Sequence, residues 1–244
     1  MAAAAPSALA AGAFAAAAAW CAPGPAPHVP ALARACGIAR TLPLDGAVAL
    51  TFDDGPHPQG TPAVLELLRA RGAVATFFLV GEQVRRTGSL AGEILAAGHA
   101  VAIHGDTHRM LLTLTPRAQR EDLDRAAETI GAGAIPVHRA PYGVWSAGAL
   151  REDRRRGWTA LLWSRWGRDW RARTDAHEIA RLATRDLTAG DVVLLHDADD
   201  YSAPGSWRNT AAALPRILDA IEERGLRTAL VRGNAHGGPP PALT

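Results

Sequence analysis

The sequence predicts an α/β fold in which a mostly parallel sheet is surrounded by helices and preceded by an alanine-rich N-terminal appendage. From residue 46 onward, short apolar runs alternate with amphipathic segments, and this pattern yields about seven strands. The length of 244 residues accommodates one barrel of alternating strands and helices, which needs about 250 residues. Unusual polar residues fall at the ends of predicted strands, and closure into a barrel would gather them on one face.

The predicted strands are short apolar runs bounded by turn-forming residues. The run AVALTF at 47–52 precedes Asp-Asp-Gly-Pro, and the run ATFFLV at 75–80 precedes Gly81. The full set of predicted strands is 47–52, 75–80, 100–103, 134–139, 159–163, 192–195 and 227–231.

The predicted helices lie between these strands, and two of them have clear start signals. Thr61-Pro62 is typical of an N-cap followed by the first helical residue, and this helix is expected to end at Gly72. Thr115-Pro116 predicts the start of a longer helix that runs to about Ile130. The full set of predicted helices is 61–72, 90–97, 115–130, 147–156, 176–185 and 210–224.

Composition divides the chain into an alanine-rich segment at 1–45, a barrel at 46–232 and a Pro/Gly-rich tail at 233–244. Residues 1–33 carry no charged side chain unless His28 is protonated. Two interpretations of this segment stay open. A signal or membrane anchor would place the protein in the cell envelope or outside the cell, although the basic start of a signal is missing. The alternative is a soluble alanine-rich helix, and membrane contact is expected only through residues 1–33.

Charge and cysteine content narrow the function classes. A formal net charge of +2 provides no electrostatic basis for binding nucleic acid. Both cysteines, Cys21 and Cys36, lie in the N-terminal segment, and their spacing matches no zinc motif. They either pair in an oxidising compartment, which would add about 3 kcal/mol by loop closure, or remain two free thiols.

Reactive side chains occur at or shortly after the ends of five predicted strands. They are Asp53-Asp54, His104, Arg139, Asp169 and His196. His108 follows His104 by four residues, so both imidazoles face one side if this loop turns like a helical turn. Two imidazoles and one carboxylate suit zinc or a similar divalent ion. Of the two adjacent carboxylates, one could bind the metal while the other acts as a base.

Five segments resemble, in order, the five signatures of the nodulation-type polysaccharide deacetylases, carbohydrate esterase family four. They are Thr51-Phe-Asp-Asp-Gly-Pro56, His104–His108, Arg139-Ala-Pro-Tyr-Gly143, Asp169-Trp170 and Val193-Leu-Leu-His-Asp197. The resemblance as a whole covers roughly Ala47 to Val231, and Gly105 stands where the family more often has Ser or Thr. The resemblance implies an irregular (β/α)7-type barrel, which agrees with the strand count.

The resemblance also implies the metal ligands and the proton-transfer residues. Asp54, His104 and His108 would hold one divalent metal ion, with zinc expected and cobalt or another divalent ion as the alternative. Asp53 would be the general base. Arg139 would pair with Asp53 and keep it ionised.

The remaining implied roles concern the leaving group and the substrate. His196 would be the general acid, oriented and kept protonated by Asp169. The backbone N–H of Tyr142 would hold the oxyanion of the tetrahedral intermediate. Trp170 and Leu194 would wall a small apolar pocket of about the size of an acetyl methyl group.

These assignments predict a metal-dependent hydrolase that removes N-acetyl, or O-acetyl, groups from a glycan such as peptidoglycan or chitin-type oligomers. The alternative is hydrolysis of another carbon–nitrogen amide bond, as in a deformylase of a lipid-linked sugar or a small-molecule amidase. A non-catalytic carbohydrate-binding protein is a third reading, which the presence of Asp53 and His196 disfavours. The segment 197–207 is expected to be a loop on the active face that contacts sugar, narrows the groove or is simply solvated.

Overall fold

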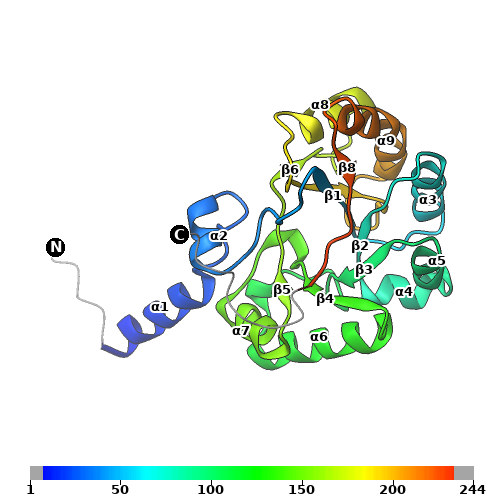
Figure 1. The fold of residues 1–244 in the computed structure, drawn as a ribbon. Helices are drawn as coiled ribbons and strands as arrows, with labels where there is room; N and C mark the ends of the chain where they lie inside the picture. The colour runs from blue at the N-terminus through cyan, green and yellow to red at the C-terminus, as the bar shows by residue number, and fades with distance from the viewer. Residues whose placement is uncertain (1–7, 234–244) are drawn as a thin grey trace.

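The computed structural model describes residues 8–233, in which seven parallel strands form one curled sheet in the order β5-β4-β3-β2-β1-β7-β6 (Figure 1). An eighth strand, β8, pairs with β1 off this path. The predicted α/β fold with a (β/α)7-type curl is confirmed. The strands are β1 Ala47–Asp53, β2 Thr76–Leu79, β3 Ala100–Ile103, β4 Ala134–His138, β5 Thr159–Ala160, β6 Arg165–Trp166, β7 Val192–His196 and β8 Arg227–Thr228.

Helices follow most of the strands and lie around the outside of the sheet (Figure 1). Short 3-10 turns, η1 Leu111–Thr113 and η2 Pro141–Gly143, occur in the loops after β3 and β4. The α-helices are α1 Ala8–Cys21, α2 Pro30–Ala35, α3 Gly60–Ala70, α4 Gly81–Thr87, α5 Leu90–Ala96, α6 Pro116–Ile130, α7 Ala147–Arg156, α8 Ala176–Thr184 and α9 Ser206–Glu222.

The central strand β1 separates two hydrophobic clusters and is buried along its whole length. Leu50 and Phe52 join the cluster between the sheet and the helices. Ala49 occupies an odd-numbered position of the strand, so its side chain points to the other face, and it belongs with Phe78 to the cluster inside the curled sheet. Because successive side chains of a strand alternate between faces, Asp53 shares the inner face with Ala49. The last residue of β1 therefore enters the mouth of the barrel interior.

Of the two helix N-caps predicted from the sequence, one is present in the structure and the other is not. The cap predicted at Thr115 is confirmed, because its side chain accepts the Ala118 N–H at the start of α6. The cap predicted at Thr61 is wrong, since α3 begins at Gly60 and its N-cap residue, Gln59, makes no side-chain cap hydrogen bond. The Thr61 hydroxyl instead accepts the His57 N–H at 2.7 Å.

Helix α4 was not predicted, because its sequence, GEQVRRT, has no apolar periodicity. Its first N–H groups are satisfied by another loop. The Gly81 N–H donates to Gly105 O at 3.0 Å, and the Glu82 N–H donates to Asp106 O at 2.9 Å. Helix N-terminal N–H groups need such partners, and here tertiary structure provides them.

The strand predicted at 159–163 is shorter in the structure, and the strand β6 that follows it was not predicted. After β5, the Leu161 N–H donates to His138 O, but the Leu162 N–H turns to Ala39 O of the N-terminal segment. The carbonyls of Leu161 and Leu162 accept hydrogen bonds from Arg139. These two carbonyls therefore bind the buried guanidinium of Arg139 instead of extending the hydrogen bonding of strand β5.

The N-terminal segment is partly exposed and partly packed into the barrel. In Figure 1, α1 extends away from the sheet, and Phe14 on it is 77% exposed. Ala26, Ala33 and Ile38 are buried in the inner cluster. Cys21 and Cys36 are both free thiols. Within the described part of the chain, no helix has the length and apolar character needed to cross a membrane. Residues 1–7 and 234–244 of the predicted end segments lie outside the described residues.

Candidate active site and metal centre

The parallel strands bring the predicted site residues to one end of the sheet. Asp53 ends β1, His196 ends β7, and the two are register partners. His104 directly follows β3, and Arg139 directly follows β4, which pairs with β3 through Ile103 and His138. Carboxyl ends of parallel strands are where active sites of such barrels form.

Asp54, His104 and His108 point their ligand atoms at one another. Asp54 Oδ1 lies 3.3 Å from His104 Nε2 and 3.2 Å from His108 Nε2, and all three side chains are almost fully buried. The loop that carries the histidines contains a bend rather than a helical turn. The two imidazoles nevertheless face the same carboxylate, with ring centroids 5.3 Å apart.

The hydrogen bond on the other side of His104 assigns its tautomer. Nδ1 lies 2.7 Å from the carbonyl oxygen of Arg139, which can only accept, so Nδ1 carries the hydrogen. Nε2 therefore faces the Asp54 carboxylate, with a lone pair whenever no proton is bound there. Two acceptors this close repel each other unless a proton or a cation lies between them.

The environment of Asp54 fits a cation between these atoms. Oδ1 is buried and has no hydrogen-bond partner among residues 8–233, although both imidazoles are near. Burial alone would raise the pKa of Asp54, but the neighbouring His104 and His108 hold it well below its usual range. Asp54 also has a positive φ of 77°, a strained conformation of a kind that is found at functional sites. This donor set of two imidazoles and one carboxylate fits a zinc-type ion.

Asp53 forms a separate buried pair with Arg139. The guanidinium Nη1 donates to Asp53 Oδ1 at 2.6 Å and to the Thr51 hydroxyl at 3.0 Å. Arg139 is fully buried, with its guanidinium carbon 3.9 Å from the centroid of the Phe78 ring. Burial lowers the pKa of Arg139 and the Asp53 carboxylate raises it in return, so the buried charges stabilise each other. Asp53 is thus aimed at the site while its neighbour Asp54 faces the histidines.

His196 is held by Asp169 and is protonated at neutral pH. One carboxylate oxygen of Asp169 lies 3.0 Å from His196 Nδ1, and the other accepts the His196 N–H at 2.7 Å. The Thr210 hydroxyl of α9 also donates to Asp169 at 2.8 Å. Burial lowers the pKa of His196, but Asp169, with smaller contributions from Asp54 and Asp53, outweighs it and raises that pKa to about 10. This imidazolium is suited to donating a proton from its other nitrogen.

The three predicted substrate contacts have different surroundings. Tyr142 has a positive φ of 60° and is 51% exposed. The first backbone hydrogen bond of its 3-10 turn is donated by the next residue, from the Gly143 N–H to Ala140 O. Trp170 packs edge-on against His196, with centroids 5.6 Å apart. Leu194 is buried in the inner cluster, two residues before His196 on β7. Contact of any of the three with a substrate stays a prediction.

Comparison with known proteins identifies the family. The sequence model of the family described as Polysaccharide deacetylase matches residues 43–161. A chitooligosaccharide deacetylase of Sinorhizobium fredii is 38% identical over 200 residues, which cover 76% of this chain and 92% of the relative. The chain belongs to the polysaccharide deacetylase family. It is therefore a hydrolase of the type that acts on carbon–nitrogen bonds other than peptide bonds.

Two further relatives of this polysaccharide deacetylase extend the comparison. A peptidoglycan-N-acetylglucosamine deacetylase of Bacillus cereus is 31% identical over 189 residues, which cover 75% of this chain and 85% of the relative. The solved structure of a family 4 carbohydrate esterase from Streptomyces lividans, in complex with acetate, matches with a TM-score of 0.69 and 30% identity. That match covers 78% of this chain and 95% of the esterase.

Two buried aspartates of this deacetylase support the site but were not predicted to do so. Asp122 of α6 accepts the Asp106 N–H at 2.9 Å and the Thr107 hydroxyl at 2.6 Å, which fixes the loop between the two histidines. At Gly105, φ is +88° and a Cβ would lie 3.1 Å from Asp122 Oδ2. Glycine suits this backbone, and here a carboxylate holds the loop where the family more often has a hydroxyl.

The second supporting aspartate, Asp197, clamps the loop after β1. Its Oδ2 accepts a hydrogen bond from Thr61, and a Cβ on Gly55 would lie 2.7 Å from its carboxylate. Burial raises the pKa of Asp197 to about 7, despite the Thr61 hydrogen bond. Asp197 belongs to the quoted Val193–Asp197 segment, but only the fold shows that it contacts the Asp53-Asp54-Gly-Pro loop. No pattern in the sequence pointed to Asp122.

A second group of potential ligands in the described part of the polysaccharide deacetylase is His57, Asp199 and Asp200. His57 Nδ1 accepts two backbone N–H groups, at 3.2 and 2.9 Å, so Nε2 carries the hydrogen. That nitrogen lies 3.3 Å from Asp199 Oδ1, and Asp200 pairs with Arg86 at 2.7 Å. Each of these three side chains has a hydrogen-bond or ion-pair partner of opposite character. We therefore call His57, Asp199 and Asp200 the ion-pair cluster.

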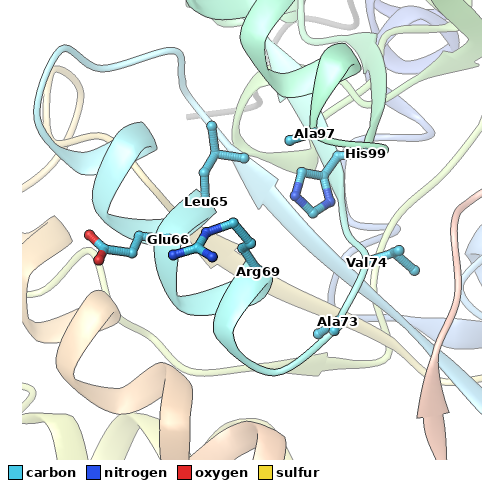
Figure 2. Close-up of a pocket in the computed structure, with 8 residues that line it drawn as sticks. Leu65, Glu66, Arg69, Ala73, Val74, Ala97 and His99 are labelled. Carbon is cyan, nitrogen blue, oxygen red and sulfur yellow. The ribbon is translucent and has the colours of Figure 1, made fainter.

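A hollow of about 460 Å³ lies at the opposite end of the strands (Figure 2). Leu65 and Arg69 of α3 line one side, and His99, just before β3, lines the other. His99 Nδ1 accepts the Ala75 N–H at 3.2 Å, and burial lowers the pKa of this imidazole. The hollow lies at the amino ends of β2 and β3, away from the deacetylase site.

Proposed function

We propose that this chain is a metal-dependent N-deacetylase of glycans built from N-acetylglucosamine, with Asp54, His104 and His108 as the metal ligands. The observation that carries the proposal is the buried Asp54 Oδ1, which faces two imidazole nitrogens without a hydrogen bond of its own. The deacetylases of chitooligosaccharides and peptidoglycan among its relatives support the substrate class. The products are a free amine on the sugar and acetate.

The chain's own residues account for the proton transfers. When bound, a divalent ion supplies a water of lowered pKa and polarises the amide carbonyl. Asp53, held by its hydrogen bond from Arg139, accepts a proton from the attacking water. The Tyr142 N–H donates to the oxygen that gains negative charge. His196, protonated through its contact with Asp169, donates its proton to the departing amine nitrogen.

Release of acetate from defined substrates tests this proposal. The full chain is stripped with a chelator and then assayed with and without added zinc on chitin oligomers, peptidoglycan and acetylxylan. We expect acetate from the N-acetylated glycans only, loss of activity on chelation and recovery with zinc. Activity that survives complete metal removal would contradict the metal assignment. Release of acetate from acetylxylan alone would show that the substrate bond is an ester rather than an amide. Release of formate from an N-formylated amino sugar would favour the deformylase alternative.

A further inference from the structure

The two histidines that face Asp54 are held in different ways. His104 is fixed by the hydrogen bond from its Nδ1 to Arg139 O. His108 Nδ1 is buried and has no hydrogen-bond partner within residues 8–233. Metal-binding histidines usually have their second nitrogen fixed by such a bond, which sets the orientation of the ring. Another contact must therefore orient the ring of His108.

Two tyrosine rings enclose His108. The ring of Tyr201 stacks on it, with centroids 4.3 Å apart and an interplanar angle of 16°. The ring of Tyr142 packs edge-on, with centroids 4.5 Å apart and an angle of 62°. Stacked and edge-on arrangements are the favoured geometries for planar rings. Together they restrict rotation of the imidazole.

The stacked tyrosine is itself held in place by α4. Its hydroxyl donates to Glu82 and accepts a hydrogen bond from Gln83 Nε2 at 2.8 Å. Burial and the Glu82 carboxylate raise the pKa of Tyr201, so the phenol keeps the proton that it donates. The Glu82 N–H also donates to Asp106 O, on the loop that carries His108. Helix α4 therefore ties the tyrosine and the histidine loop to one support.

The loop around Tyr201 is anchored on both sides of that residue. Asp199 accepts the Gly205 N–H and faces His57 Nε2 at 3.3 Å. Asp200 pairs with Arg86 of α4 at 2.7 Å. These contacts explain the second histidine–aspartate group, because they fasten the loop that presents Tyr201.

We propose that Tyr201 is a positioning residue for the metal ligand His108, whose ring it orients by stacking in place of a hydrogen bond to Nδ1. The inference rests on the proposed function, because it assumes that His108 binds the metal. It gives the loop at 197–205 a role in the metal centre in addition to any contact with sugar.

Zinc affinity of the full chain, measured by competition with a chromophoric chelator and without substrate, tests this role. Tyr201→Leu removes the ring, and we expect zinc binding to weaken by about 10- to 100-fold, as for loss of other groups that orient a ligand. Tyr201→Phe keeps the ring, so its zinc affinity should fall much less. Ser202→Ala is the matched control in the same loop, since the Ser202 hydroxyl pairs with Ser206 rather than with His108 or α4, and it should bind zinc like the wild type.

Wild-type zinc affinity in Tyr201→Leu would overturn the proposal, and so would an equal loss in Ser202→Ala. Thermal unfolding checks that each variant is folded. If Tyr201→Leu is not, Tyr201→Gln, which lacks a ring but can still donate to Glu82, replaces it under the same criteria. A wild type that binds zinc but releases no acetate would overturn only the proposed function. A wild type that binds no zinc would overturn both.

Discussion

Two groups of histidine and aspartate side chains occur in the described part of this chain, and they differ in how their polar atoms are satisfied. In Asp54, His104 and His108, a buried carboxylate oxygen faces at least one ring nitrogen that carries a lone pair. In His57, Asp199 and Asp200, each group faces a complementary partner. In both groups, three potential ligand atoms lie within 4.8 Å of one another. The unsatisfied Asp54 oxygen is therefore the feature on which the proposed metal site rests, since closeness of the ligand atoms does not distinguish the two groups.

The largest expected effect separates Asp53 from the metal ligand beside it. Asp53→Asn keeps the shape of the side chain but removes the base, and turnover should fall by about 10²- to 10⁴-fold. Bound metal should be retained, because Asp53 hydrogen-bonds to Arg139 and its other oxygen lies 3.8 Å from His104 Nε2, whereas Asp54 lies closer to both imidazoles. Acetate release and metal content, measured on one preparation, check both parts.

The control for that experiment lies away from the site. Asp219→Asn changes a carboxylate of an exposed ion pair with Arg71 in the same way and should leave turnover close to that of the wild type. Normal turnover in Asp53→Asn would show that another group is the base.

A smaller effect concerns the pH dependence of the general acid. Asp169 is the main group that stabilises the charged form of His196, whose pKa is raised to about 10 by Asp169 together with Asp54 and Asp53. Asp169→Asn removes that negative charge, so the pKa falls and the imidazole loses its proton at lower pH. The alkaline limb of the kcat/KM profile should therefore move to lower pH. An alkaline limb that does not move would argue against His196 as the proton donor.

The smallest effect is expected for the stability of the second group. Asp200→Asn breaks the ion pair with Arg86, whose side chain is about half exposed. Solvent-exposed pairs contribute about 0–1 kcal/mol, so the free energy of unfolding in urea should change by no more than about 1 kcal/mol. A much larger loss would show that this loop carries part of the global stability.

Much of the site could be predicted from the sequence because it depends on strand ends. Asp53 and His196 were placed at strand ends by apolar runs alone, and the parallel register then brings them together. The details that failed depend on tertiary partners. The first turn of α4 is satisfied by carbonyls of the loop after β3, and Thr61 serves Asp197 instead of capping α3. In both cases the hydrogen-bond partner is distant in the sequence, so local sequence patterns could not predict the contact.

The stacking partner of His108 shows the same limit. The segment at 197–207 was recognised as a loop on the active face, but its sequence does not reveal that Tyr201 reaches His108 and hydrogen-bonds to α4. The contact depends on helix α4, which has no periodic signature. Local patterns thus predict where reactive groups leave the sheet, whereas the contacts that orient them appear only in the folded chain.

The most direct test of the account is the metal content of the full chain in three forms: wild type, His104→Ala and His57→Ala. We predict about one divalent ion per chain in the wild type and in His57→Ala, and none in His104→Ala, because only His104 directs a lone pair at an unsatisfied carboxylate. A full complement of metal in His104→Ala, or its loss in His57→Ala, would contradict the account.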